Sequence, residues 1–405
     1  GRIEVLGKHT DYAGGRSLLC AIERGLCFAA AARADTLLRI HDARIGETAE
    51  IPVHPDTRPR AGHWSAYPAT VAQRLAANFS AETPVVGADV AFVSDLPIAA
   101  GISSSSALVV GTYSVLAAIN RLEERAAFRH SIDGNPALAE YLGAVENGLT
   151  YRGLAGEHGV GTFGGSEDHT AMLCAEPGRL IQYSFCPVRR ERVVPLRPEV
   201  VFAIASSGVV AEKTGAALSS YNRLASLARA ALAAWNRATR NQNRTHDLTL
   251  AGALASAGSV DALAFAIESV PQVDGFSADE LTERARQFAI ESEELIPGAG
   301  DALLAGRLDL FGTIVDRSMR NAVEMLHNQT PETIFLAEQA RALGAVAASA
   351  FGAGFGGSVW AMVERERALA FVTAWQDEYS ARFPGLMNAE FFITEAGIPA
   401  TALND

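Results

Sequence analysis

Residues 96–119, LPIAAGISSSSALVVGTYSVLAAI, place a loop of small residues directly before a long apolar helix. Small side chains let the backbone close around phosphates, and the beginning of the helix adds its positive dipole end. The serine hydroxyls can bond phosphate oxygens or ligate Mg²⁺. A flexible Ser/Gly linker is the alternative, but such linkers do not continue into a long apolar helix. The stretch therefore predicts a phosphate-binding loop.

A second informative stretch lies at the beginning of the chain. Residues 1–15, GRIEVLGKHTDYAGG, gather four polar side chains at the end of an apolar strand: Arg2, His9, Asp11 and Tyr12. Such a cluster suits a sugar pocket, because each sugar hydroxyl both donates and accepts a hydrogen bond. A solvated β-turn is the alternative, and the stretch alone favours it slightly.

A third stretch, FGAGFGGSVWAMVE at residues 351–364, is a glycine-rich turn before an apolar strand. By itself it is typical of a tight turn between strands. Its significance depends on the other two stretches.

The composition predicts a globular protein of two domains. The chain has 405 residues, 49% hydrophobic and 20% charged, and single cores stop growing well before this length. The formal net charge of -12 argues against a non-specific nucleic-acid binder, which needs a basic surface. The four cysteines form no CxxC pair, and no apolar run reaches the roughly 18 to 20 residues of a membrane span. We expect a cytoplasmic protein, monomeric or weakly dimeric, without nucleic-acid or membrane partners.

The order of the expected elements places the domain boundary near residue 195, in VVPLRPEV, and gives domains 1–195 and 196–405. Before the boundary we expect β-rich structure at residues 1–32, a helix at 64–79, a strand at 86–97 and, after the phosphate loop, a helix at 105–119. After the boundary we expect a strand at 200–207, long helices over 208–350 and a final strand at 358–364. Because Gly1 resembles the middle of a strand, we also expect the natural chain to begin upstream.

Together and in this order, the three stretches resemble the signature motifs of galactokinases and their relatives among the GHMP small-molecule kinases. Four further segments are similar to segments of the family. WSAY at 64–67 is similar to its adenine-side segment and GGSEDH at 164–169 to its catalytic-aspartate segment. SSYNR at 219–223 is similar to its sugar-side segment and GRLDLFGTIVDRSMRNA at 306–322 to its C-terminal helices. The resemblance spans nearly the whole chain. It implies an α+β fold with a ribosomal-protein-S5-like N-terminal domain and a ferredoxin-like C-terminal domain, and the activity of an ATP-dependent sugar kinase.

The resemblance also implies the catalytic residues. Asp168 matches the family's catalytic aspartate, the acceptor of the sugar hydroxyl proton. Arg2 matches the motif arginine, which would hold that carboxylate ionised and stabilise the developing charge. A surface carboxylate capping a helix is the alternative for Asp168.

On the nucleotide side, the resemblance assigns Trp64 to the adenine and Gly101, Ser103, Ser104, Ser105 and Ser106 to the phosphates, with Ser105 facing the metal. The family also uses a glutamate as a Mg²⁺ ligand, and two candidates remain, Glu146 in VENG and Glu157 in GEHG. We prefer Glu146, because it ends a helical pattern and does not lie in a glycine-rich loop.

On the sugar side, four residues occupy positions that the family uses: His9, Asp11, Gly165 and Tyr221. Any of them could instead be structural, His9 and Tyr221 most of all.

The departures from galactokinases concern the substrate. Lys8 stands where galactokinases carry glutamate and Glu4 where asparagine is usual. Glu167 and His169 flank the catalytic aspartate in place of methionine and glutamine, and Ala99 replaces a glycine of the phosphate loop. These departures put galactose itself in doubt.

Lys8 is the residue on which the substrate prediction depends. The family's glutamate there faces the exocyclic hydroxyl of the sugar, so a cationic donor would favour an anionic group. A uronic acid or other modified hexose would fit. Alternatively, Lys8 pairs with Glu4 or Glu167 and never meets the substrate.

Two other functions compete with a sugar kinase. One is a non-catalytic regulatory protein that binds sugar and ATP on the same fold, which the retention of Arg2, Asp168 and the serine run disfavours. The other is a kinase of mevalonate-type or homoserine-type alcohols, which the HTDY and WSAY segments disfavour.

Overall fold

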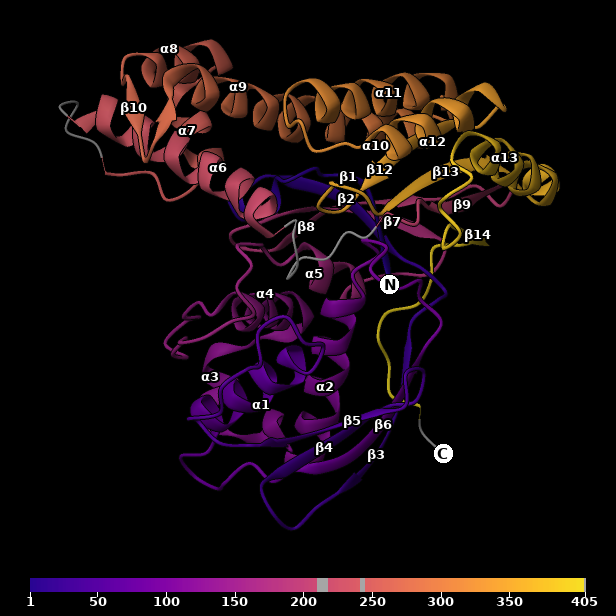
Figure 1. Ribbon diagram of the computed structural model, residues 1–405. Helices are drawn as coiled ribbons and strands as arrows, with labels where there is room; N and C mark the ends of the chain where they lie inside the picture. The colour runs from indigo at the N-terminus through magenta and orange to yellow at the C-terminus, as the bar shows by residue number, and fades with distance from the viewer. Residues whose placement is uncertain (210–217, 241–244, 404–405) are drawn as a thin grey trace.

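The computed structural model describes residues 1–209, 218–240 and 245–403 (Figure 1). The described strands form three four-stranded sheets and one short hairpin, β10–β11, at Gln272–Val273 and Phe276–Ser277. The first sheet has the order β1, β2, β7, β8, at Arg2–Leu6, Arg16–Ala21, Arg179–Ser184 and Arg189–Pro195. The second has the order β3, β6, β4, β5, at Leu26–Ala32, Ala88–Ser94, Leu37–Asp42 and Glu47–Pro52. The third has the order β12, β13, β9, β14, at Ala347–Phe351, Ser358–Glu364, Val200–Ser206 and Glu390–Thr394.

One end of the molecule consists of the second sheet and the helices that cover it (Figure 1). Along β6, Val90 and Phe92 are buried whereas Asp89 and Ala91 are exposed, so one face of the sheet carries the apolar side chains. This face shares a core with the first helices of the chain, α1 at Ala66–Phe79, α2 at Ser104–Asn120, α3 at Ala126–Ser131 and α4 at Gly134–Asn147. The N-terminus of α2 is thereby fixed at the edge of this unit.

The opposite end is mainly helical (Figure 1). Its helices are α6 at Leu218–Ala238, α7 at Leu250–Ala257, α8 at Val260–Glu268, α9 at Ala278–Ala289, α10 at Ile296–Leu304, α11 at Leu308–Glu324, α12 at Pro331–Ala342 and α13 at Ala368–Arg382. A π-helical turn at Ile290–Leu295 joins α9 to α10. Among the described helices no single one is long and apolar enough to cross a membrane, although α7 and α8, bent by 106°, pass that test of length and composition as a pair.

A shared apolar core joins the two ends. Ile3 of β1, Phe202 of β9, Phe311 of α11 and Trp360 of β13 are all buried in it. The other face of the third sheet packs on α12 and α13 around Trp375. The first sheet, which carries β1, therefore lies against the C-terminal elements as well as the N-terminal ones.

Most elements lie where the sequence predicts them, including the strand that follows the proposed boundary, whereas the strand before it, β8, was not predicted. β8 ends at Pro195 and β9 begins at Val200 in a different sheet; the division at residue 195 stays a prediction. The expectation of long helices to about residue 350 is wrong at the short hairpin β10–β11 and at β12, whose five residues are a buried strand. A short apolar run has no periodicity that distinguishes a strand from the end of a buried helix.

Candidate active site

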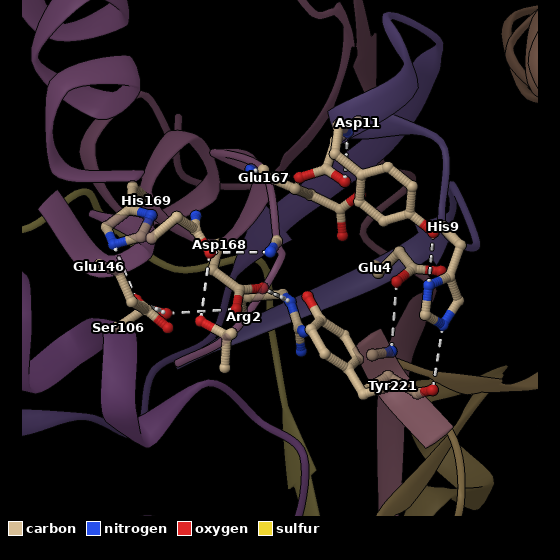
Figure 2. A pocket seen from close by; sticks show the side chains of 17 residues that line it. Arg2, Glu4, His9, Asp11, Ser106, Glu146, Glu167, Asp168, His169 and Tyr221 are labelled. Carbon is tan, nitrogen blue, oxygen red and sulfur yellow. Dashed lines mark hydrogen bonds and ion pairs between the residues drawn. The ribbon is translucent and has the colours of Figure 1, made fainter. Parts of the chain in front are cut away.

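A pocket opens where the N-terminal strand, α4, the helix α5 at Glu167–Leu173 and the turn after β12 meet (Figure 2). The sequence stretches that line it are far apart in the chain, since they include Arg2, Glu146, Asp168, Tyr221 and Gly352.

Arg2 connects the phosphate loop with the middle of the pocket. Its Nε donates to Oδ1 of Asp168 at 2.8 Å, and its Nη1 donates to the carbonyl oxygen of Gly101 at 2.9 Å. The guanidinium is only 2% exposed. Burial alone would lower the pKa of Arg2, but the carboxylates of Asp168, Glu167 and Glu4 raise it above its ordinary value. Arg2 therefore stays a cation directly beside Asp168.

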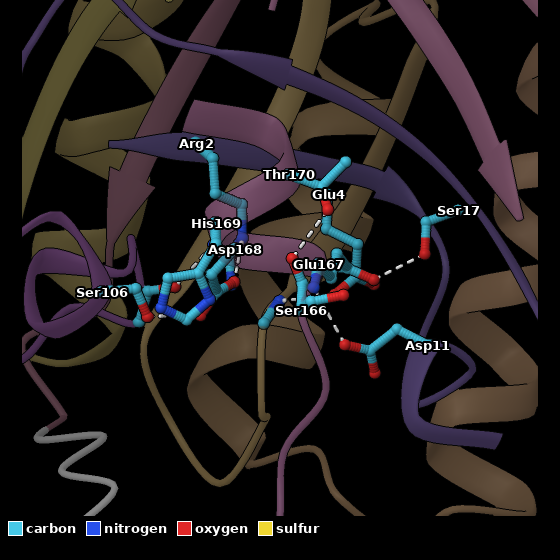
Figure 3. A network of polar contacts seen from close by, with 12 residues as sticks. Arg2, Glu4, Asp11, Ser17, Ser106, Ser166, Glu167, Asp168, His169 and Thr170 are labelled. Atoms are coloured by element: carbon cyan, nitrogen blue, oxygen red, sulfur yellow. Dashed lines mark hydrogen bonds and ion pairs between the residues drawn. The ribbon is translucent and has the colours of Figure 1, made fainter. Parts of the chain in front are cut away.

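Ser106 joins two carboxylates on the far side of Asp168 (Figure 3). Its hydroxyl lies 3.0 Å from Oε2 of Glu146 and 3.2 Å from Oδ2 of Asp168. Nε2 of His169 lies 3.2 Å from the same Glu146 oxygen. The two oxygens of Asp168 are thus held from opposite sides, one by Arg2 and one by Ser106.

The two candidate metal carboxylates have different surroundings. Glu146 is 3% exposed and lines the pocket at the end of α4. Glu157 is about half exposed and pairs with Arg58 at 3.4 Å. Among the described residues, no group of three or more His, Cys, Asp or Glu side chains is arranged to hold a metal ion.

The phosphate loop lies between β6 and α2, and its backbone bends sharply. Ala99, Gly101 and Ser103 have φ values of 50°, 70° and 60°. Helix α2 begins directly afterwards at Ser104, so its first free N–H groups lie at the loop. Within the described part of the chain, the buried Oγ of Ser103 has no hydrogen-bond partner. The loop thus offers an unused donor beside a helix N-terminus.

The glycine-rich turn packs directly on this loop. Oγ of Ser358 donates to the carbonyl oxygen of Ala100 at 2.7 Å. A Cβ on Gly101 would lie 3.6 Å from the Cα of Gly357, so the two backbones nearly touch. With the bond from Arg2 to Gly101, all three sequence stretches meet at one place.

His9, from the turn after β1, and Tyr221, from α6, line the same pocket. The His9 ring bonds the Tyr12 hydroxyl at 2.9 Å and the Ala353 carbonyl oxygen at 3.0 Å. The rings of His9 and Tyr221 have centroids 5.7 Å apart. These two polar side chains are therefore fixed at the pocket wall.

Asp11 and Gly165 form the wall opposite. Asp11 accepts the backbone N–H groups of Tyr12 at 2.8 Å and of Glu167 at 3.0 Å. A Cβ on Gly165 would lie 2.1 Å from Oδ2 of Asp11, so only glycine fits there. The aspartate thus ties the beginning of the chain to the beginning of α5.

Three family models match segments of this chain. The galactokinase galactose-binding signature matches residues 1–32, the GHMP kinase N-terminal domain residues 66–147, and the GHMP kinase C-terminal domain residues 301–381. The chain belongs to the GHMP kinase superfamily. The two-domain α+β fold implied by the motifs is thereby confirmed.

Curated relatives of this GHMP kinase are named galactokinase. One from Roseiflexus sp. is 27% identical over 92% of this chain and 84% of its own length. One from Exiguobacterium sibiricum is 28% identical over 99% of this chain and 89% of its own length. The chain is a galactokinase-like sugar kinase.

Solved structures show the same fold. Lactococcus lactis galactokinase complexed with galactose superposes with a TM-score of 0.79 at 23% identity, over 100% of this chain and 93% of that one. Methanococcus jannaschii mevalonate kinase superposes with a TM-score of 0.55 at 12% identity, over 98% and 96%.

Lys8 does not line the pocket of this GHMP kinase. It is 1% exposed, and its Nζ lies 3.3 Å from Oγ of Ser318, which in turn donates to Glu291 at 2.9 Å. The side chain therefore points toward α11 and the π-helical turn. This geometry favours the alternative in which Lys8 has a structural role: its hydrogen bond goes to Ser318, and its charge acts on the nearby carboxyl group of Glu4, one of the two partners proposed from the sequence.

Trp64, Gly101 and three of the serines, Ser103, Ser104 and Ser105, are not among the residues that line this pocket. Trp64 precedes α1 and packs edge-on against Phe92 of β6, with centroids 5.8 Å apart. Ser104 and Ser105 are half-buried in the first turn of α2. Their assignments to the nucleotide and the metal remain predictions.

Among the pocket residues without a substrate or catalytic role assigned from the sequence are two glutamates and a histidine: Glu4, Glu167 and His169. The sequence marks all three as departures from the galactokinase pattern. The useful signal was that acidic or titratable residues occupy family positions that are usually neutral.

Proposed function

We propose that this chain transfers the γ-phosphoryl group of ATP to a hydroxyl of a hexose, with Asp168 as the proton acceptor. The observation that carries the proposal is the position of Asp168, whose carboxylate lies between the phosphate loop and the sugar-side residues and is held by Arg2 at 2.8 Å. Phosphoryl transfer requires mainly alignment and charge compensation. A carboxylate fixed on both oxygens satisfies the first requirement.

In this mechanism the sugar hydroxyl loses its proton to Asp168 as its oxygen attacks the γ-phosphorus. Arg2 stabilises the negative charge that develops at the reacting centre, since its guanidinium also contacts Gly101 of the phosphate loop. Ser106 keeps the second oxygen of Asp168 in place. His9, Asp11, Gly165 and Tyr221 would orient the sugar.

The chemistry of Glu146 and the adjacent hydroxyls fits a Mg²⁺ site, because carboxylate and hydroxyl oxygens are hard ligands. Glu146 and the serines of the loop would hold the ion: Ser105 is the choice from the sequence, and Ser106 is the serine that contacts Glu146. Bound there, Mg²⁺ neutralises charge on the nucleotide phosphates.

The proposal of a uronic acid or other modified hexose depended on Lys8. The contacts of Lys8 with Ser318 give a uronic acid no support. The substrate proposed here is therefore a hexose, and a carboxylate group on that hexose is not part of the proposal.

An ADP-release assay over a panel of neutral hexoses, hexosamines, uronic acids and heptoses tests the function. ADP should form only with Mg²⁺ and a suitable sugar, and the product should be a sugar phosphate. Sugar binding without ADP would contradict the proposal and favour the regulatory protein. ADP formed with mevalonate or homoserine but with no sugar would favour the other class of alcohol.

A further inference from the structure

Two buried carboxyl groups lie side by side in the pocket without an evident role in phosphoryl transfer (Figure 3). Glu4 comes from β1 and is 3% exposed; Glu167 begins α5 and is 7% exposed. Oε2 of Glu4 accepts the Gly352 N–H at 3.2 Å, and Oε2 of Glu167 accepts the Ser17 hydroxyl at 2.5 Å. Each group thus has one oxygen fixed by the protein.

The other oxygen of Glu4 lacks a donor. Oε1 is buried and has no hydrogen-bond partner within the described residues, although Glu167 lies within hydrogen-bonding reach of the Glu4 carboxyl group. Two carboxylates cannot bond each other, so either they share a proton or a donor from outside the protein completes the pair. A buried acceptor left unsatisfied is costly.

The nearby cations do not satisfy the pair by hydrogen bonding. The side-chain hydrogen bonds of Arg2 go to Asp168 and Gly101, and that of Lys8 goes to Ser318. Burial, then the neighbouring charges of Glu4 and Asp11, raise the pKa of Glu167 well above its ordinary value. This part of the pocket is therefore rich in acceptors and acidic protons, and poor in free cationic donors.

We propose that Glu4 and Glu167 act together as a specificity pair, so that the sugar bound is a hexose presenting hydroxyl or amino donors to them and not a sugar acid. This inference rests on the proposed function, because it concerns the acceptor in the same pocket. A hydroxyl or ammonium group can donate to either carboxyl group. A sugar carboxylate would be a second anion against a buried anion.

The test compares galactose, its 2-amino and 6-amino derivatives and galacturonate, using wild type, Glu167→Gln and Glu4→Gln. Both kcat/KM with ATP and the Kd by calorimetry are measured. Wild type should use galacturonate at least about 10-fold less well than galactose, since a charge-assisted contact becomes a repulsive one. In either glutamine variant, the ratio of kcat/KM for galactose to kcat/KM for galacturonate should fall about 10-fold. Each variant should also bind at least one amino sugar more weakly than wild type does. Glu366→Gln, which removes one charge from an exposed turn, should leave the ranking unchanged.

The outcomes separate this inference from the proposed function. If no sugar supports ADP release but the Kd values follow the expected order, the kinase proposal fails and the specificity pair stands. If wild type binds or phosphorylates galacturonate as well as galactose, the pair is overturned. It is equally overturned if the ratio of kcat/KM for galactose to that for galacturonate is the same in wild type and in the glutamine variants. Should Glu167→Gln fail to fold, Glu4→Gln gives the same comparison from β1.

Discussion

Nε of Arg2 and Oδ1 of Asp168 lie 2.8 Å apart, although 166 positions separate the two residues in the sequence. The pair joins β1 to α5 at the pocket, and the same guanidinium reaches the phosphate loop through Gly101. The ion pair thus also holds the carboxylate of Asp168 in place relative to the phosphate loop. A shift of either element would separate the carboxylate from the loop.

The first prediction concerns Asp168. Asp168→Asn should lower kcat by about 10² to 10⁴, the usual loss for a general base, while the Kd for ATP stays within about twofold, because the carboxylate acts on the sugar hydroxyl. Steady-state kinetics and nucleotide titration measure both. Asp301→Asn, at an exposed aspartate of α10 that pairs with Arg192, is the matched control and should behave as wild type. Retention of more than half of the wild-type kcat by Asp168→Asn would show that another group is the base.

The second prediction separates the two candidate metal ligands. Glu146→Gln should raise the Mg²⁺ concentration needed for half-maximal activity by about 10-fold or more, because a charged oxygen ligand becomes a neutral one. Glu157→Gln should change it little, since that side chain is half exposed and pairs with Arg58. Mg²⁺ titrations of both variants decide between them. If Glu157→Gln raised the Mg²⁺ requirement more than Glu146→Gln did, the metal ligand would be Glu157.

How far the sequence predicts this site depends on the kind of residue. The phosphate loop and the pairing of Arg2 with Asp168 were inferred from the resemblance of the ordered motifs to the family. Glu146 was preferred over Glu157 because it ends a helical pattern, and that choice remains a prediction. The strand β12 was missed since a five-residue buried run has no diagnostic periodicity.

The direction of Lys8 could not be inferred in the same way. Successive strand residues point to opposite faces, but Lys8 follows the end of β1, where the chain turns through Gly7 at a φ of 140°. Its hydrogen-bond partner Ser318 lies 310 positions away, and no local pattern predicts such a contact. For the same reason the contact between Glu4 and Glu167 became evident only in three dimensions.

The third prediction follows from the contacts of Lys8. Lys8→Met should lower the free energy of unfolding by about 1.5 to 3 kcal/mol, the worth of a hydrogen bond to a charged group. It should reduce kcat/KM for every sugar by a similar factor, leaving the ratio of uronic acid to hexose unchanged. Ser318→Ala removes the same hydrogen bond and should have a similar effect on stability. If Lys8→Met changed the ratio of uronic acid to hexose activity, Lys8 would instead contact the substrate.

The fourth prediction concerns the pH dependence of stability at Glu4. Burial raises the pKa of this carboxyl group from 4.5 to about 7, against the opposing charges of Lys8 and Arg2, with Glu291 adding a further rise. Between these two values the folded protein holds a proton that the unfolded chain releases. The stabilisation from this proton is therefore complete below about pH 4.5 and is lost as the pH rises through about 7.

Glu4→Gln removes this titration, because the amide resembles the protonated acid at every pH. The variant should match wild type near pH 5 and become progressively more stable than wild type toward pH 8, by a few kcal/mol at about 1.4 kcal/mol per pKa unit. Urea unfolding at several pH values measures the difference, and Glu366→Gln should follow wild type throughout. Because Glu4 and Glu167 titrate as a pair, Glu167→Gln should reduce the same slope. A difference between Glu4→Gln and wild type that is constant from pH 5 to pH 8 would mean that Glu4 is ionised across the whole range, and the acid pair would then lack its shared proton.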